Sequence, residues 1–297
     1  MKFTDKHFEL ARSYILENKF PDWVLGFKSI VMGAPGAGKT TSLAMLLKLG
    51  FKVYVMFTEQ GIGNLLKACR TVGCTDEDMK RLFYCYIPPG GTSFEALAKG
   101  AKAVNEASEF GKMDNNTMDR KKYGQLIQCM KMCNNFIDQH GVDHGSIEDF
   151  GCNCVFALDG MSNLARMAMQ LTVGAKPVKT LQDWGVAIES LENFENQITT
   201  IKAPFVLLAH IERETDEVTQ KIYVTIATLG NKYPLRIGRN YHDVILAENT
   251  KDGFIWSTTS RDCQLKGTYL PIADKQAADF RPLVCQWLYD NGLVEFK

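Results

Sequence analysis

The chain has 297 residues, of which 45% are apolar and 23% are charged, a composition typical of a folded protein with a substantial core. Its 34 basic and 34 acidic residues give a net charge of zero, which excludes a polycationic protein that wraps nucleic acid by charge alone but not a local basic patch. Without a run of about 18 apolar residues we expect no membrane span. Nine cysteines without a scaffold spacing, and an N-terminus without a signal-peptide core, predict reduced thiols and a cytoplasmic location.

Apolar runs and helical periodicities alternate along the first 210 residues. The strand candidates are short continuous apolar runs, the pattern of strands buried on both faces, whereas the helix candidates repeat apolar residues every three or four positions. Such alternation predicts an α/β fold with a mainly parallel sheet and helices on both faces. The expected strands are residues 28–33, 51–57, 82–87, 152–158 and 204–209, and the expected helices are residues 4–18, 39–49, 62–70 and 181–198.

Two segments depart from this alternation. Residues 108–150 are polar at both ends around a helix-like centre, and we interpret them as an insertion or lid on the core. Beyond residue 210, β-rich runs and a turn-forming sequence at 249–253 predict antiparallel strands at the C-terminal side of the sheet. We therefore expect an N-terminal helical segment over 1–27, a core over 28–275 and a C-terminal extension over 276–297.

Residues 33–40, GAPGAGKT, match the phosphate-loop pattern G-x-x-x-x-G-K-[ST] and lie between an expected strand and an expected helix. The glycines permit backbone angles that turn N–H groups toward phosphate oxygens, and the helix adds the positive end of its dipole. We expect Lys39 to contact the β- and γ-phosphates and Thr40 to bind Mg²⁺. Because no N-K-x-D guanine motif occurs, the expected nucleotide is ATP. The expected binding residues are Gly33, Ala34, Pro35, Gly36, Ala37, Gly38, Lys39, Thr40 and Thr41.

Two carboxylates follow expected strands. Asp159 ends an apolar run, which suits a carboxylate that holds Mg²⁺, usually through water, although the same pattern fits an ordinary strand-capping residue. Glu59 ends the strand after the phosphate-loop helix, 20 positions beyond Lys39. It could orient the water that attacks the γ-phosphate, or it could be a surface residue at the start of the next helix, where the dipole favours negative charge.

The order of these features resembles the RecA-type ATPase core: the loop at 33–40, then VYVMFT before Glu59, VFAL before Asp159 and VLLA before His210. More narrowly, the chain is similar over residues 28–275 to the RecA-like ATP-binding proteins of bacteriophages, a group that includes single-strand annealing proteins. The resemblance implies that Glu59 is the catalytic base and that His210 senses the γ-phosphate. In the family the residue at the position of His210 is commonly Gln, and it relays the state of the γ-phosphate to DNA-contacting loops. Because this chain has histidine there, the resemblance leaves that relay role open.

The resemblance also implies a homo-oligomer in which a neighbouring subunit supplies cations to the γ-phosphate. Arg261 and Lys266 stand in the late segment from which such residues come, and Arg213 is a second candidate. An arginine placed there stabilises transition-state charge. The alternative is that these residues form a solvated hairpin end.

Single-stranded DNA is the partner that the resemblance implies, bound by the segments after the fourth and fifth strands. These segments are residues 160–180 and 211–240, in which cations would meet phosphates and a base could stack on Tyr233. The acidic run IERETDE opposes this interpretation. The basic residues concerned are Arg166, Lys176, Lys179, Lys232, Arg236 and Arg239.

A zinc site is the alternative role of the six cysteines and histidines between residues 129 and 154. No paired C-x-x-C occurs and two of the cysteines lie in a buried strand, which favours core residues. The residues are Cys129, Cys133, His140, His144, Cys152 and Cys154.

The sequence thus predicts a Mg²⁺-dependent ATPase that acts on single-stranded DNA in phage recombination or annealing, in the host cytoplasm. One alternative is an ATP-gated assembly protein without a DNA role, which the zero net charge supports. Another is a nucleotide or small-molecule kinase, but such enzymes usually carry an arginine-rich lid, and residues 110–150 contain only Arg120.

Overall fold

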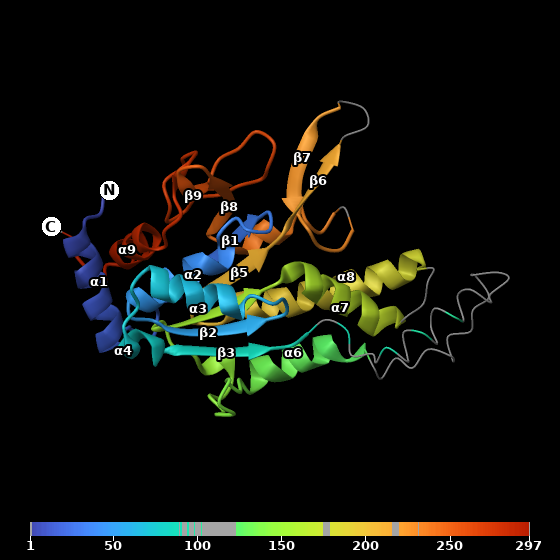
Figure 1. Ribbon diagram of the computed structural model, residues 1–297, viewed down its shortest axis with the longest axis horizontal. Helices are drawn as coiled ribbons and strands as arrows, with labels where there is room; N and C mark the ends of the chain where they lie inside the picture. Colours follow the sequence, from blue (N-terminus) through green and yellow to red (C-terminus); the bar gives the residue numbers. More distant parts are fainter. Residues whose placement is uncertain are drawn as a thin grey trace.

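The protein is built around one central sheet, with helices on both sides of it (Figure 1). The computed structural model describes residues 2–88, 90, 94, 98, 102, 123–174, 179–215, 220–230 and 232–296. Within these residues the main sheet has eight strands, in the spatial order β10 (Gln276–Ala277), β9 (Gly253–Ser257), β8 (Asp243–Thr250), β1 (Lys28–Gly33), β5 (Phe205–Ala209), β4 (Cys154–Asp159), β2 (Lys52–Phe57) and β3 (Leu82–Tyr86).

Six of these strands, from β8 to β3 in the spatial order, run parallel, and β9 and β10 are antiparallel additions beyond β8. This arrangement confirms the predicted α/β fold class with a mainly parallel sheet, including the antiparallel strands at the C-terminal side. The turn between β8 and β9 also lies where the sequence predicts it, with Thr250 paired to Gly253. The phosphate-loop strand β1 lies between β5 and β8, inside the sheet.

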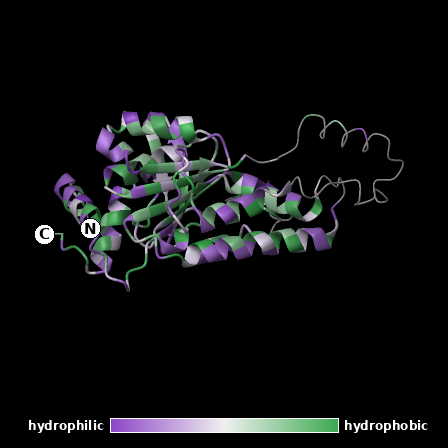
Figure 2. Cartoon of the chain, turned by 90° about the horizontal axis from the view of Figure 1, so that it is seen from below, coloured by the Kyte–Doolittle hydropathy of each residue, from purple (hydrophilic) through white to green (hydrophobic). Residues whose placement is uncertain are grey.

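Alternate residues of the strands point to two separate hydrophobic cores. In β1, Val31 belongs to one core cluster, whereas Ile30 and Met32 belong to the other, as the two-residue period of a strand requires. Figure 2 shows hydrophobic residues in the central strands and both hydrophobic and hydrophilic residues on the surrounding helices. The first core, which contains Val31, includes residues of α1 (Asp5–Glu17), α2 (Lys39–Lys48), α3 (Ile62–Thr71) and α9 (Arg281–Asp290). The second core, which contains Ile30 and Met32, includes residues of α6 (Gln125–Asn134), α7 (Met161–Val173) and α8 (Leu181–Thr200).

The N-terminal and C-terminal helices pack together on the side of the sheet that holds the first core. Helices α1 and α9 contact one another, and Ile15 of α1 and Trp287 of α9 are buried in the same cluster as Val31. The Trp287 indole Nε1–H donates to the Leu25 carbonyl at 3.0 Å. Helix α4 (Asp76–Met79) follows α3, and short 3₁₀ turns η4 (Ile147–Asp149) and η5 (Ile237–Asn240) lie elsewhere in the chain.

The segments expected to be loops contain regular structure. Residues 161–173 of the expected DNA-binding segment form α7, because apolar residues there recur at helical spacing and are buried. After His210 the chain forms a separate two-stranded ribbon of β6 (Ile211–Thr215) and β7 (Ile222–Ile226). Leu181, the first residue of α8, is 92% exposed.

Residues 123–150 of the expected insertion pack against the second core; its residues 108–122 lie outside the described part of the chain. Helix α6 contacts α7, and Phe136 and Phe150 are buried there. Of the helices described, none has the length and apolar character needed to cross a membrane.

Candidate active site

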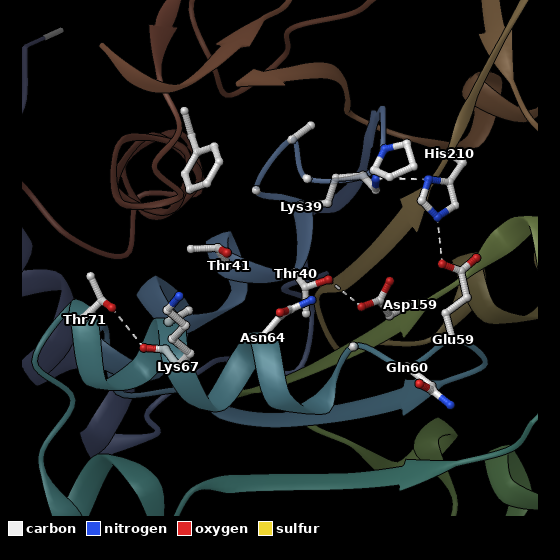
Figure 3. Close-up of a pocket in the computed structure, with 17 residues that line it drawn as sticks. Lys39, Thr40, Thr41, Glu59, Gln60, Asn64, Lys67, Thr71, Asp159 and His210 are labelled. Atoms are coloured by element: carbon white, nitrogen blue, oxygen red, sulfur yellow. Dashed lines mark hydrogen bonds and ion pairs between the residues drawn. The ribbon is translucent and has the colours of Figure 1, made fainter. Parts of the chain in front are cut away.

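The residues predicted to form the phosphate site follow the carboxyl ends of neighbouring parallel strands. Gly33 is the last residue of β1, and Asp159 is the last residue of β4. His210 directly follows β5, and Glu59 lies two residues after the end of β2. In the sheet Phe57 pairs with Asp159, so Glu59 emerges two residues further on beside the aspartate. Since parallel strands end at a common edge, residues far apart in sequence meet there, the usual location of ligand sites in such sheets. Figure 3 shows these side chains converging on the loop.

The phosphate loop depends on glycine at three positions. Gly36 and Gly38 have φ angles of 80° and 82°, the left-handed region that side chains disfavour. A Cβ atom at Gly33 would lie 2.3 Å from the Ala247 carbonyl oxygen of β8. The loop therefore fits against the sheet only with these glycines, as its sequence predicts.

Lys39 is the first residue of α2 and is 7% exposed. Its Nζ donates to the carbonyl oxygens of Gly33 and Ala34 at 2.8 and 3.0 Å, so the ammonium group spans the loop from within. Burial lowers the pKa of Lys39, while the carboxylates of Asp159 and Glu59 act in the opposite direction. A phosphate oxygen would supply the negative charge that this buried cation favours.

Thr40 and Asp159 form the oxygen pair that the sequence assigns to the metal. The Thr40 hydroxyl donates to Asp159 Oδ2 at 2.7 Å, and Asp159 is 4% exposed. Burial raises the pKa of Asp159 to about 6, against the effect of the Thr40 hydrogen bond. A Cβ at Gly61 would lie 2.7 Å from Asp159 Oδ2, so the glycine leaves this carboxylate accessible. A hydroxyl and a carboxylate are ligands that suit Mg²⁺, and the donor set fits that ion.

His210 connects the lysine to the second carboxylate. Its Nδ1 lies 3.3 Å from Lys39 Nζ, and its Nε2 lies 2.7 Å from Glu59 Oε2. Because an ammonium group only donates, Nδ1 accepts, and the imidazole carries its proton on Nε2 and donates it to Glu59. The His210 and Glu59 side chains are 26% and 25% exposed, so both reach the cavity.

Three residues that sequence reasoning missed support Glu59. The Thr58 hydroxyl donates to the Gly160 carbonyl at 2.7 Å, and Asn163 Nδ2 donates to the Thr58 carbonyl at 2.9 Å. Gly160 has a φ of 117°, and a Cβ there would lie 2.1 Å from Thr58 Oγ1 and 2.8 Å from Glu59 Cγ. The one available signal was the glycine directly after Asp159.

A cavity of about 580 Å³ extends from this edge of the sheet along the loop to α3. In Figure 3, Lys67 and Thr71 lie at the opposite side of the site from Glu59 and His210. Sequence reasoning missed these α3 residues, although their positions, three to four apart, mark one helix face. Beyond the residues already described, the lining includes Thr41, Gln60, Asn64, Lys67, Ala68, Thr71 and Phe254.

Arg261 and Lys266 are not among the residues that line this cavity. The Lys266 Nζ donates to the Tyr241 carbonyl at 2.6 Å, and Arg261 is exposed on the loop after β9. Arg213 is exposed on β6. No arginine of the described ranges lines the cavity, and the role of Arg261 in the site of a neighbouring subunit stays a prediction.

The expected stacking of a base on Tyr233 is wrong for this structure. Tyr233 is 1% exposed and belongs to the second core cluster, so its ring already packs against protein. Arg236 forms an ion pair with Glu192. Arg166 and Lys179 line a second cavity of about 410 Å³. Lys232 and Arg239 are exposed, and Lys176 lies outside the described residues.

The cysteines and histidines near residue 140 have structural partners. His144 Nε2 lies 2.9 Å from Asp138 Oδ2, and the Cys152 thiol lies 3.3 Å from the Val24 carbonyl. Cys129 and Cys152 are buried in the cores. Among the residues that the structure describes, no group of three His, Cys, Asp or Glu side chains is placed to hold a metal.

No protein-family model matches the chain, and no curated protein matches its sequence significantly. Solved structures do match. An ATPase from the type III secretion system of pathogenic bacteria has 11% identity and a TM-score of 0.40, over 77% of this chain and 53% of the other. EscN, from the type III secretion system of enteropathogenic E. coli and solved as an assembled ATPase with its central stalk EscO, has 9% identity and a TM-score of 0.40, over 77% and 43%.

A third similar structure is the flagellar accessory protein FlaH from Methanocaldococcus jannaschii. It has 11% identity and a TM-score of 0.34, over 85% of this chain and 83% of that chain. The match spans about half the length of the two secretion ATPases. These distant similarities assign neither an activity nor a partner to this chain. Its function is therefore inferred from the geometry of the site.

Proposed function

We propose that the protein binds ATP with Mg²⁺ in the loop at 33–41 and hydrolyses it. The observation that carries this proposal is the contact series from Lys39 through His210 to Glu59, which places a carboxylate beside the buried lysine of the loop. A phosphate loop alone would support only the binding of a nucleotide. A carboxylate held beside the loop lysine supports hydrolysis as well, because it can act as a general base toward water.

In the proposed reaction, the γ-phosphate lies against Lys39, whose Nζ exchanges its carbonyl partners for phosphate oxygens. Thr40 and Asp159 would hold Mg²⁺, which neutralises charge on the β- and γ-phosphates when bound. Glu59 orients a water molecule and accepts its proton as the water oxygen bonds to the γ-phosphorus and the bond to the β–γ bridging oxygen breaks. The Nε2–H of His210 fixes the carboxylate for this step.

The adenosine would occupy the other end of the cavity. With the γ-phosphate placed at Glu59 and His210, the remaining space lies between α3 and Phe254. The Phe254 ring contacts the loop, since a Cβ at Gly38 would lie 2.6 Å from its Cγ. An aromatic ring suits a base by stacking, and Asn64 offers an amide for hydrogen bonding.

We further propose single-stranded DNA as the partner, in recombination or annealing of the phage type, with a homo-oligomer as the active form. In support, the chain leads from the catalytic edge into the second cavity: α7 follows Asp159, and β6 follows His210. The cations Arg166 and Lys179 line that cavity, but so does Glu212. Arg261 would act on the site of a neighbouring subunit, and the assembled state of EscN is consistent with such a role.

Phosphate release from ATP tests the proposal. Because general-base catalysis contributes about 10²–10⁴-fold, Glu59→Gln should lose that factor in kcat and retain ATP binding. Glu248→Gln, on the exposed end of β8, is the matched control and should leave the rate unchanged. A Glu59→Gln variant that is as fast as the natural chain would contradict the hydrolase assignment.

Single-stranded DNA and solution mass separate the finer alternatives. Stimulation of phosphate release by DNA, reduced in Arg166→Ala, supports the DNA role. ATP-dependent growth in mass with no response to DNA would instead support an ATP-gated assembly, and phosphate that appears on an added nucleotide would support a kinase.

A further inference from the structure

Two cysteines face each other at the end of the helix that lines the nucleotide cavity. Helix α3 ends at Thr71, and Gly73 follows with a φ of 72°. The Cys74 N–H donates to the Cys69 carbonyl at 2.8 Å, and the Gly73 N–H donates to the Arg70 carbonyl at 3.1 Å. This pair of bonds defines the Schellman motif, in which the first and last side chains of the closing turn contact one another. Here those side chains are Cys69 and Cys74.

The Schellman turn brings Cys69 and Cys74 together, and the two thiols differ in access to solvent. The Cys74 thiol lies 3.7 Å from the Ala44 carbonyl oxygen of α2. Cys69 is fully buried in the first core, whereas Cys74 is partly exposed. An external reagent therefore reaches Cys74 first, and Cys69 can attack only a partner already attached to Cys74.

Two cations, Lys48 and Arg81, act on the accessible thiol. Lys48 Nζ donates to the Val72 carbonyl at 2.8 Å, within the same turn, and Arg81 donates to the Leu47 carbonyl of α2. The neighbouring Cys69 thiol lowers the pKa of Cys74, and so do Lys48 and Arg81, against the effects of burial and of Asp78. The pKa of Cys69 is raised, first by the neighbouring Cys74 thiol and then by burial. Reactive cysteines combine partial exposure with such an electropositive setting.

We propose that Cys69 and Cys74 form a reversible dithiol–disulfide pair that responds to low-molecular-weight disulfides. This inference is independent of the proposed ATPase activity. Nothing in the phosphate chemistry uses either sulfur.

The reaction balances with oxidised glutathione as the oxidant. The Cys74 thiolate attacks one sulfur of glutathione disulfide, which forms a mixed disulfide and releases one glutathione thiolate. Cys69 then gives its proton to that thiolate and attacks the Cys74 sulfur, so that the protein disulfide forms and the second glutathione leaves. Two protein thiols are oxidised, and one glutathione disulfide is reduced to two thiols.

Peptide mapping of the folded natural chain tests the pair. The protein is equilibrated in reduced and oxidised glutathione, the free thiols are alkylated, and the product is cut with trypsin. Because Arg70 lies between the two cysteines, the disulfide would join peptide 68–70 to peptide 71–80. We expect this linked pair, with a mass loss of two hydrogen atoms in the intact protein and full reversal by dithiothreitol.

Variants and alkylation rates sharpen the result. Cys74→Ser should prevent both the link and any adduct at this turn, whereas Cys69→Ala should stop at a mixed disulfide with one glutathione on Cys74. Cys263→Ser is the control, because burial raises the pKa of that partly exposed thiol to about 12. In the reduced chain Cys74 should react with iodoacetamide about tenfold faster than Cys263, since the thiolate is the nucleophile.

Two outcomes in the natural chain would overturn the inference. One is alkylation of both Cys69 and Cys74 after equilibration with oxidised glutathione. The other is a stable glutathione adduct on Cys74 that never resolves to the linked peptides.

Discussion

Lys28 and Lys39 are buried near opposite ends of β1, with exposures of 4% and 7%. Each ammonium group donates to two backbone carbonyls, those of Ile201 and Ala203 in the case of Lys28. Burial lowers the pKa of both, that of Lys28 to about 7. The difference lies in their surroundings, because Lys39 faces a cavity and an imidazole, whereas Lys28 holds the chain that enters β5.

The same contrast holds for two buried aspartates. Burial raises the pKa of Asp159 and of Asp243 to about 6. Asp243 Oδ1 accepts the backbone N–H groups of residues 268–270 at 3.0–3.1 Å, and Oδ2 lies 3.5 Å from the Tyr269 nitrogen, so backbone donors hold this carboxylate. In the described part of the chain, the side chain of Asp159 accepts only the Thr40 hydroxyl and borders the cavity. Burial and pKa therefore do not distinguish a functional charge from a structural one, whereas unused hydrogen-bonding capacity that faces a cavity does.

The largest effect should separate the two lysines. Lys39→Met removes two charge-assisted phosphate contacts of about 1.5–3 kcal/mol each, so ATP affinity should fall about a thousandfold. Lys28→Met should change the thermal midpoint and leave ATP affinity within about twofold, because its carbonyl partners lie outside the nucleotide cavity and distant sites act almost independently. Titration with a fluorescent ATP analogue measures both, and equal losses in the two variants would remove the contrast.

The two aspartates should respond in opposite ways. Asp243→Ala leaves three backbone N–H groups without their acceptor, which should cost about 3 kcal/mol of unfolding free energy with little change in hydrolysis by the folded protein. Asp159→Asn should lower Mg²⁺-dependent hydrolysis and leave the fold as stable as before or more so, since it removes a buried charge. Urea unfolding and phosphate release are measured on both variants. The contrast would be contradicted if Asp159→Asn lost stability and Asp243→Ala lost hydrolysis instead.

The titration of Asp243 predicts a dependence of stability on pH. Its pKa in the folded chain, about 6, lies above its ordinary value of 3.8, so the folded state binds more protons between these pH values. Stability from this group therefore falls as the pH rises from about 4 to about 6, by about 3 kcal/mol. Asp243→Asn should lack that component, so its unfolding free energy relative to the natural chain should rise over the same window. Parallel pH profiles of the two proteins would refute the prediction.

The smallest effect concerns the base end of the cavity. Phe254→Ala should weaken ATP binding about fivefold, because an aromatic pair contributes about 0.5–1.5 kcal/mol. Binding of inorganic triphosphate, which lacks a base, should stay the same. Isothermal titration with both ligands gives the comparison, and an equal loss for the two would mean that Phe254 supports the loop rather than the base.

The meeting of the candidate site residues was predictable because each of them belongs to a short local sequence pattern. The loop at 33–40, Glu59, Asp159 and His210 each follow an apolar strand, and parallel strands end at one edge, so their meeting follows from order alone. The strands were predictable for the same reason, since buried parallel strands are continuous apolar runs.

The remaining features depend on contacts across the fold. Phe254 reaches the loop because β8, the hairpin partner of β9, lies beside β1, and no local pattern reveals that these two distant strands are neighbours. The burial of Tyr233 depends on packing against the second core, so its aromatic character alone suggested a stacking surface. Helix α7 was missed because a family loop was expected where apolar residues recur at helical spacing.

One residue separates β5, in the central sheet, from β6, in the separate ribbon, and that residue is His210. Its carbonyl accepts the Ala227 N–H at 2.8 Å, just beyond the end of β7, so both strands of the ribbon are joined to it. The imidazole that contacts Lys39 and Glu59 therefore stands at the junction between the central sheet and the ribbon. The position of the ribbon strands and the position of this side chain are set by the same residue.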